Sequence, residues 1–257
     1  MRLETVWRVE DGTRLASTVW RAGAGYRMIS SAMLGGGIGP AGWVLNAQVA
    51  GGYSRMDPVV HLMELAGSHG LEGPGVGMLT AASVSRTMRR DDEGVAVSAT
   101  VGLRVPTWAA SPAGVCDSEL APMRLDGTSP PAWTPGTINI VVAVPVPLND
   151  AALVNAVITA TEAKTQALLE AGYPCTGTAS DAVCIAAPTS SGAAATSSGA
   201  AATDGGGEAE AAVTGGGAAE PFAGPRSVWG SRIARAVHAA VHAGALDYTA
   251  YLESRAT

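Results

Sequence analysis

Three short clusters of polar side chains in the second half of the chain have residue types suited to acid–base chemistry. Thr137 and Asn139 alternate along a strand-like run, so they share one face. Glu162 and Lys164 are two residues apart in a helix-like stretch, which places them about 200° apart around the helix axis. Asp181 belongs to the turn "TGTASDA". Each cluster lies at the edge of an element, so the clusters are either ordinary caps and turns or parts of one cleft.

A glycine-rich stretch, "SSAMLGGG", provides a fourth candidate feature. Ser30 and Ser31 end a strand-like segment and lead into Gly35, Gly36 and Gly37. Successive backbone N–H groups in such a loop can bind an anion or form an oxyanion hole, and a tight turn is the alternative. The motifs of a nucleophile elbow, a P-loop and a dinucleotide-binding loop are missing from this sequence.

The histidines do not predict a metal site. His238 and His242 have i, i+4 spacing, but they share their side of the helix with Arg235, and the sequence has no HExxH motif. We expect a solvated face there. We also expect His61 to pair with Glu64 at the surface. No metal or other cofactor is predicted.

Composition excludes several classes of function. The chain has 257 residues, of which 47% are hydrophobic and 15% charged, and its net charge of -6 argues against a nucleic-acid partner. No apolar run reaches the roughly 18 residues of a membrane helix. Cys116, Cys175 and Cys184 have no zinc-site spacing, and no signal peptide is evident. These features predict a cytoplasmic protein, with Cys184 as a buried apolar residue.

Strand-like segments outnumber helix-like ones. Strands are expected at 3–9, 15–22, 43–50, 75–83, 94–103, 138–146 and about 182–188, with another beginning at 26. Helices are expected after the cap–proline pair Asp57–Pro58, from Asn149 or Asp150 to about Ala171, and within 224–248. We predict an α+β fold with mixed or antiparallel β-sheet and long helices on the outer faces. One sheet or two remains open.

Two segments interrupt this pattern inside a single predicted domain of residues 1–257. Residues 106–135 are rich in Pro, Ser, Ala and Gly and form a long irregular loop that can act as a lid. Residues from about 189 to 221 are of low complexity, with "SSGAAAT" repeated in tandem. Such a tract buries too little apolar surface to offset its ordering entropy, so it is predicted to be a disordered insertion.

An ordered set of motifs resembles the adenosylcobinamide amidohydrolases of corrinoid salvage. These motifs are "SSAMLGGG", "VLNAQV" with "MDP", "GVGMLTAA", "GTINIVV", "TATEAKTQALLEAG", "GTASDAV" and "GSRIARAV". Two departures are the low-complexity insertion and Ser180, which stands where the family usually has threonine. The resemblance implies hydrolysis of the amide between the corrin ring and the aminopropanol arm of adenosylcobinamide, giving adenosylcobyric acid. It makes the corrinoid a substrate, not a cofactor.

That reaction needs an attacking oxygen, a base, an oxyanion donor and an acid for the leaving amine. Glu162 or Asp181 is the expected base, and Lys164 the expected acid or oxyanion donor. Asn139 and the glycine-loop N–H groups are further oxyanion donors. Ser31 or Thr137 can instead be a nucleophile activated by Lys164, but direct attack by water is favoured.

The matching motifs also supply the expected substrate-binding residues, which are Ser30, Ser31, Gly35, Gly36, Gly37, Asn46, Asp57, Thr80 and Thr178. Trp43, Met78, Trp108 and Trp133 are candidates to line a corrin-sized cleft, although core packing is the favoured interpretation. Oligomer formation and the preferred corrinoid remain open. Two other functions compete: a non-catalytic corrinoid-binding protein, and a self-processing acyl-transferase related to aminopeptidases.

Overall fold

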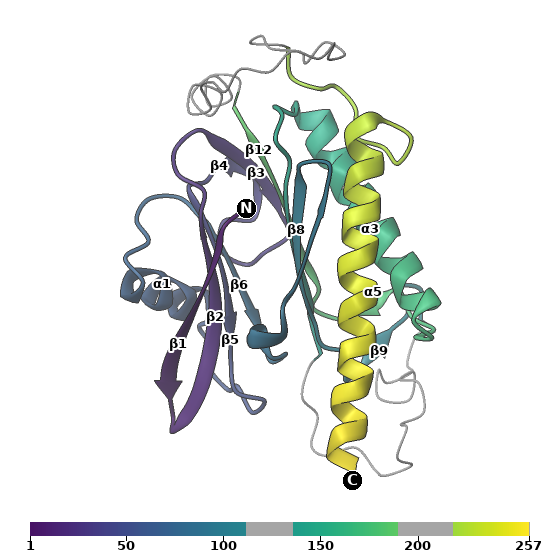
Figure 1. Ribbon diagram of the computed structural model, residues 1–257. Helices are drawn as coiled ribbons and strands as arrows, with labels where there is room; N and C mark the ends of the chain where they lie inside the picture. Colours follow the sequence, from purple (N-terminus) through teal and green to yellow (C-terminus); the bar gives the residue numbers. More distant parts are fainter. Residues whose placement is uncertain (112–135, 190–217, 257) are drawn as a thin grey trace, which may run out of the picture.

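The protein has two β-sheets packed face to face between outer helices. The computed structural model describes residues 1–111, 136–189 and 218–256. Figure 1 shows α1 (Pro58–Ser68) on one side, two layers of strands in the middle, and α3 (Asp150–Glu170) with α5 (Val228–Ala256) on the other side. This arrangement confirms the predicted α+β class and resolves the number of main sheets as two.

The first sheet has four strands in the order β1-β2-β5-β6, which span Leu3–Glu10, Thr13–Arg21, Trp43–Gln48 and Val76–Thr80. β1 and β2 form the hairpin that "DGT" predicts, with positive φ at Asp11 and Gly12. β5 and β6 are parallel, and α1 connects them. Leu62, Leu65 and Ala66 of α1 pack against the outer face of this sheet.

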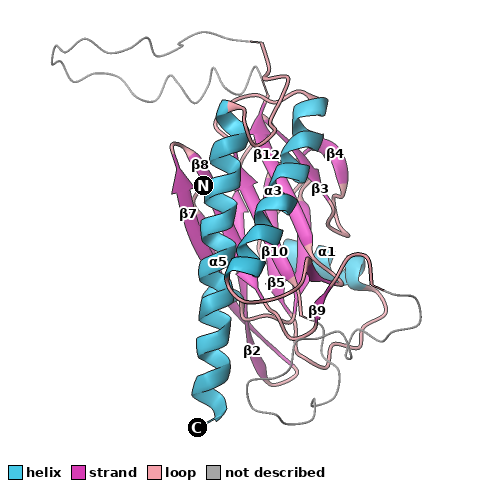
Figure 2. Ribbon diagram, turned by 90° about the vertical axis from the view of Figure 1, so that its right-hand side faces the viewer, coloured by secondary structure: helices cyan, strands magenta, loops and turns pink. Residues whose placement is uncertain are grey.

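The second sheet has six strands in the order β4-β3-β12-β10-β8-β7. They span Gly37–Pro40, Tyr26–Ser30, Ala182–Pro188, Ile138–Ala143, Val95–Val101 and Met88–Asp92. Only β10 and β12 pair in parallel, and α3 connects them. Figure 2 shows α3 and α5 side by side across this sheet. Two short strands, β9 (Pro106–Thr107) and β11 (Gly177–Thr178), pair separately, and η1 (Val84–Arg86) precedes β7.

Side-chain alternation along β10 separates two environments. Ile138, Ile140 and Val142 belong to the apolar core under α3 and α5, whereas Val141 belongs to the core between the sheets. Because successive side chains point to opposite faces of a strand, Asn139 faces the other sheet. The central strand thus brings a polar side chain into the apolar space between the two sheets.

The predicted helix signals are confirmed at α3 and only partly at α1. Asn149 Oδ1 accepts a hydrogen bond from the Ala152 N–H at 2.8 Å, as a helix N-cap does. Asp57 precedes α1 as predicted, but its side chain makes no capping bond. Its carboxylate instead accepts hydrogen bonds from Arg55, at 2.8 Å for both oxygens.

The expectation of a surface pair between His61 and Glu64 is wrong. His61 is buried, and its Nδ1 lies 3.1 Å from the Tyr53 hydroxyl, while Glu64 binds Arg55. His238 and His242 stack on each other, and His238 Nε2 lies 2.7 Å from Glu170. In the described parts of the chain, no group of three or more His, Cys, Asp or Glu side chains is placed to hold a metal ion.

Several predictions fall outside the described residues. Most of the irregular loop, at 112–135, and most of the low-complexity insertion, at 190–217, belong to this group. The single-domain boundary of residues 1–257 stays a prediction. Among the helices that the structure describes, none is long and apolar enough to span a membrane.

Candidate active site

A buried ion pair joins α3 to the turn before β12. Lys164 Nζ lies 2.5 Å from Asp181 Oδ2, and the two side chains are only 9% and 10% exposed. Lys164 projects from the face of α3 that carries Ala160, Ala163 and Ala167, all of them buried. Small residues therefore surround a long side chain that crosses the helix–sheet interface and ends at a carboxylate.

Asp181 accepts four hydrogen bonds, two on each oxygen. Oδ1 accepts from the Thr178 hydroxyl at 2.5 Å and from the Ile138 N–H at 2.9 Å. Oδ2 accepts from Lys164 and from the Thr178 N–H at 3.1 Å. A carboxylate has about four acceptor sites, so all of them are used. The arrangement requires an ionised Asp181 that holds Lys164 in place and has no free lone pair for a water molecule.

Gly177 closes one side of the Lys164–Asp181 pair. Its φ is +155°, and a Cβ atom built there would lie 2.2 Å from Asp181 Oδ2 and 2.5 Å from Lys164 Nζ. Real Cβ contacts essentially never fall below 3.0 Å. The sequence shows that Gly177 belongs to the motif "GTASDA". It does not show that the position requires glycine, because part of that requirement comes from Lys164, 13 positions earlier in the chain.

A second polar group lies beside the first. The Thr137 hydroxyl is 2.8 Å from the Ser180 hydroxyl, and Ser180 donates to the Gly136 carbonyl at 3.3 Å. The parallel register pairs Asn139 with Ala182, so the segments that enter β10 and β12 run side by side. The structure thus brings together four predicted residues, namely Thr137, Lys164, Thr178 and Asp181.

Glu162 does not join this group. It is exposed and lines a groove between α3 and α5 together with Ala234, Arg235 and His238. The 200° separation from Lys164 explains the outcome, because one residue faces the sheet and the other faces away from it. The hypothesis that Glu162 shares a cleft with the strand at Thr137–Asn139 is therefore wrong.

Asn139 is close to the site but differs from the expected oxyanion donor. It is 2% exposed, and its amide nitrogen donates to Asn46 Oδ1 at 2.8 Å and to the Leu79 carbonyl at 3.2 Å. Both amide hydrogens are thereby used. The group that Asn139 can offer is its oxygen, which is an acceptor.

The remaining predicted binding residues fall into two sets. Ser30 and Ser31 hold the end of β3 on β12, with both hydroxyls bonded to the Val183 backbone at 3.0 and 3.1 Å. Thr80 accepts from the Ala82 N–H at 3.0 Å. Asp57 is instead exposed beside Arg55 at the start of α1, in a different part of the fold.

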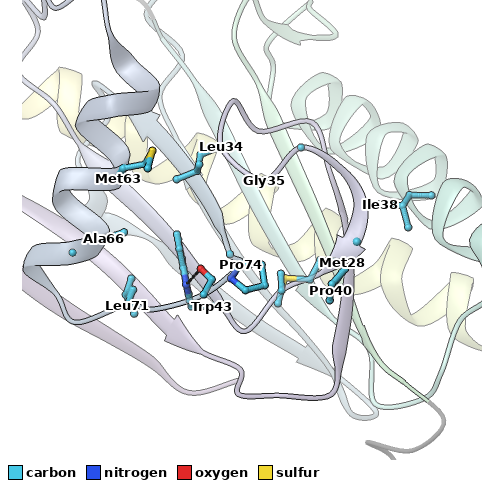
Figure 3. Close-up of a pocket in the computed structure, with 16 residues that line it drawn as sticks. Met28, Leu34, Gly35, Ile38, Pro40, Trp43, Met63, Ala66, Leu71 and Pro74 are labelled. Atoms are coloured by element: carbon cyan, nitrogen blue, oxygen red, sulfur yellow. Dashed lines mark hydrogen bonds between the residues drawn. The ribbon is translucent and has the colours of Figure 1, made fainter.

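The glycine loop, which we define as residues 31–36, continues from Ser31 to an apolar pocket of about 440 Å³. Figure 3 shows Met63 and Ala66 of α1 at one end of this pocket with Leu34 beside Met63, and Ile38 and Pro40 at the other end. Gly35 has φ +71°, and a Cβ atom there would lie 2.0 Å from the Gly75 carbonyl oxygen. Gly35 therefore occupies a tight turn that requires glycine, and Gly35 and Gly36 line the pocket, while the role of the loop N–H groups as oxyanion donors stays a prediction.

The aromatic and methionine candidates for the corrin cleft lie in different places, some at the pocket and some in the core. Trp43 lines the pocket and donates its indole N–H to the Glu72 carbonyl at 3.1 Å. Met78 belongs to the core between the sheets, as core packing predicts. Trp108 is 40% exposed, and Trp133 lies outside the described residues. Met63, another pocket residue, carried no signal in the sequence, and Gly75 belongs to the motif "GVGMLTAA" without having been singled out.

Comparisons with known proteins agree on one family. A family model described as adenosylcobinamide amidohydrolase matches residues 2–214. A Methanosarcina mazei protein named adenosylcobinamide amidohydrolase is 32% identical over 161 residues, which cover 63% of this chain and 70% of that protein. A Halobacterium salinarum protein of the same name is 47% identical over 85 residues, which cover 32% of this chain and 36% of that protein.

Proposed function

Because the chain belongs to the adenosylcobinamide amidohydrolase family, we propose that it hydrolyses the corrinoid side-chain amide with Lys164 as its electrophilic group. It is a hydrolase of corrinoid salvage, and adenosylcobinamide is the substrate that the family implies. The products are adenosylcobyric acid and the aminopropanol arm carrying a free amine. This assignment favours an enzyme over the two competing interpretations, a corrinoid-binding protein and a self-processing acyl-transferase.

The Lys164–Asp181 pair is the observation that carries the proposal. A buried ammonium group has three hydrogen-bond donors, and the structure records one of them on Asp181. The remaining donors can stabilise the charge that develops on an amide oxygen during attack. Such preorganised donors are often the largest single contribution to catalysis, and losing one costs about 10²–10³-fold in rate.

In this mechanism of amide hydrolysis, Asp181 does not act as the base. Water forms a bond to the carbonyl carbon, the C–N bond breaks, and the proton lost by water is gained by the leaving amine. Lys164 donates to the carbonyl oxygen throughout and keeps its proton, while Asp181 holds it in place. Since Lys164 is already bound to a carboxylate, it is poorly suited to act as a neutral base for Thr137 or Ser31, which supports attack by water.

The apolar pocket is the proposed contact for the rim of the corrin. Its lining of Leu34, Ile38, Trp43 and Met63 suits a large, mostly apolar ligand. Ser31 begins the glycine loop, which reaches the pocket at Leu34, Gly35 and Gly36, and it accepts a hydrogen bond from the N–H of Val183, two residues after Asp181. Lys164 and the pocket are therefore proposed to act on one bound substrate.

Two further parts of the proposal concern the setting of the reaction. We propose that the enzyme carries no resident metal, because its catalytic donors are an ammonium group and hydroxyls. We also propose a reducing, cytoplasmic location, which the two described cysteines support. Cys175 and Cys184 are both buried and unpaired.

The test is incubation of the purified protein with adenosylcobinamide, followed by mass detection of adenosylcobyric acid. A denaturing gel of the same sample checks for self-cleavage, since an intact chain runs near 25.7 kDa. Product formation by an intact chain supports the proposal. Tight corrinoid binding without product would favour the binding protein, and two gel bands would favour the self-processing enzyme.

A further inference from the structure

A chain of hydrogen bonds crosses the space between the two sheets and ends at an unpaired oxygen. It begins at η1, passes through β8 and β5, and reaches Asn139 on β10. Asn139 Oδ1 is buried and has no hydrogen-bond partner among the residues that the structure describes. Leaving a buried acceptor unsatisfied costs about 1–3 kcal/mol, so such an atom needs an explanation, and a water molecule bound at a polar site is one.

The first half of this series of hydrogen bonds has a fixed donor-to-acceptor direction. The Thr87 hydroxyl lies 2.7 Å from the Val84 carbonyl, which can only accept, so the Thr87 hydrogen points there. The Thr100 hydroxyl, 2.7 Å from that of Thr87, must therefore donate to it. Thr100 is then an acceptor for the side-chain nitrogen of Asn46, at 2.8 Å. A single backbone carbonyl thus sets the orientation of the Asn46 amide.

The second half is fixed from the other end. With its nitrogen on Thr100, Asn46 presents its oxygen to Asn139, whose nitrogen donates to it at 2.8 Å. The same nitrogen donates to the Leu79 carbonyl at 3.2 Å. If the Asn139 amide were reversed, its oxygen would face two acceptors. The hydrogen bonds at both ends of the series therefore give the same orientation, in which the Asn139 oxygen is free to accept a hydrogen bond.

We infer that Thr87, Thr100 and Asn46 are positioning residues that hold the Asn139 oxygen as an acceptor for the water that attacks the amide. This inference rests on the proposed function. Asn139 follows Ile138, whose backbone N–H binds Asp181, and it pairs with Ala182 across the parallel strands, so the acceptor and the Lys164–Asp181 pair lie at the same end of β10. Water is the chosen donor because an oxygen this deeply buried can accept from a small molecule more easily than from a corrinoid.

Lys164 and Asn139 have opposite hydrogen-bonding roles in this mechanism. Lys164 donates to the carbonyl oxygen of the substrate, and Asn139 accepts from the attacking water. An acceptor that orients this water raises kcat and leaves KM unchanged, because it makes no contact with the corrinoid. Well-oriented attack contributes strongly to rate, and a misplacement of about 1 Å can cost about 10²-fold.

The test compares Thr100→Val with Thr100→Ser in the purified full-length protein. Valine keeps the shape and removes the hydroxyl that fixes Asn46, whereas serine keeps the hydroxyl. We expect kcat for adenosylcobinamide hydrolysis to fall about tenfold or more in Thr100→Val with KM within twofold, and Thr100→Ser to stay within about threefold of wild type. Thr87→Val, placed one hydrogen bond further away, should give a smaller fall in kcat.

The outcomes separate this inference from the proposed function. Active wild-type protein with an unchanged kcat in a folded Thr100→Val variant would overturn the positioning role. An increase in KM at constant kcat would also overturn it, since that would indicate substrate binding. Equal losses in the valine and serine variants would indicate a packing effect and overturn it as well. Inactive wild-type protein would instead overturn the proposed function.

Discussion

Replacing Gly177 by alanine should disable the enzyme through one methyl group. The new Cβ would start 2.2 Å from Asp181 Oδ2 and 2.5 Å from Lys164 Nζ, and contacts under 3.0 Å are essentially never observed. Asp181 Oδ2 must therefore move away by about 0.8 Å and Lys164 Nζ by about 0.5 Å to reach 3.0 Å from the new Cβ. Because displacement of a catalytic group by about 1 Å can cost about 10²-fold, we expect kcat to fall about 30- to 100-fold.

Stability should fall as well. The positive φ of Gly177 disfavours alanine by about 1–3 kcal/mol, and overpacking adds about 1–3 kcal/mol. For a chain of this size, each kcal/mol lowers Tm by about 2–4 °C, so these two penalties together predict a decrease of roughly 4–24 °C. Thermal unfolding followed by circular dichroism measures this change alongside the activity assay.

Gly172→Ala is the matched control for this experiment. Gly172 follows α3 with φ +85°, but no atom lies within 4 Å of a Cβ built there. The control therefore imposes backbone strain without a clash, and it should lower Tm by a few degrees while kcat stays near wild type. Wild-type kcat in a folded Gly177→Ala protein would refute the reasoning, as would an equal loss of kcat in the control.

The structure makes three further predictions. Glu162→Gln should keep kcat within about threefold of wild type in the hydrolysis assay, because Glu162 is exposed on the far side of α3; a loss of about 10² or more would restore it as the base. Burial raises the pKa of the Cys184 thiol to about 12, so peptide mapping after iodoacetamide treatment at pH 8 should find Cys184 unmodified in native protein and modified after unfolding. Rapid labelling of native Cys184 would contradict its burial. Treatment with EDTA should leave the hydrolysis rate unchanged, and a loss that zinc or magnesium restores would show that the enzyme needs a metal.

Most of the long elements were predictable because their local signals agree with their tertiary packing, but the strands at Gly37–Pro40 and Met88–Asp92 were not expected. The hairpin at Asp11–Gly12 and the helix that begins after Asn149 each have turn or cap residues that act within a few positions. The number of sheets was not predictable, since each strand pattern shows only which face is buried and not what covers it. His61 was misassigned for that reason, because its partner Tyr53 comes from a loop packed beside α1.

In the candidate site, too, local geometry was predictable from the sequence and contacts between distant segments were not. Helical geometry predicts that Glu162 and Lys164 face different directions, but only the packing of α3 on the sheet decides which of them is buried. Likewise, alternation places Asn139 on one face of its strand, whereas the direction of its amide depends on Asn46, 93 residues earlier. Residue type and spacing select the candidates, and contacts between distant segments assign their roles.

The central claim is that Lys164, held by Asp181, drives amide hydrolysis. The most direct test is single-turnover conversion of adenosylcobinamide to adenosylcobyric acid by wild type, Lys164→Met and Asp181→Asn, with circular dichroism to confirm folding. The account predicts product from wild type, a rate reduced about 10²–10³-fold or more in Lys164→Met, and a smaller but clear reduction in Asp181→Asn. Wild-type conversion by folded Lys164→Met would contradict it.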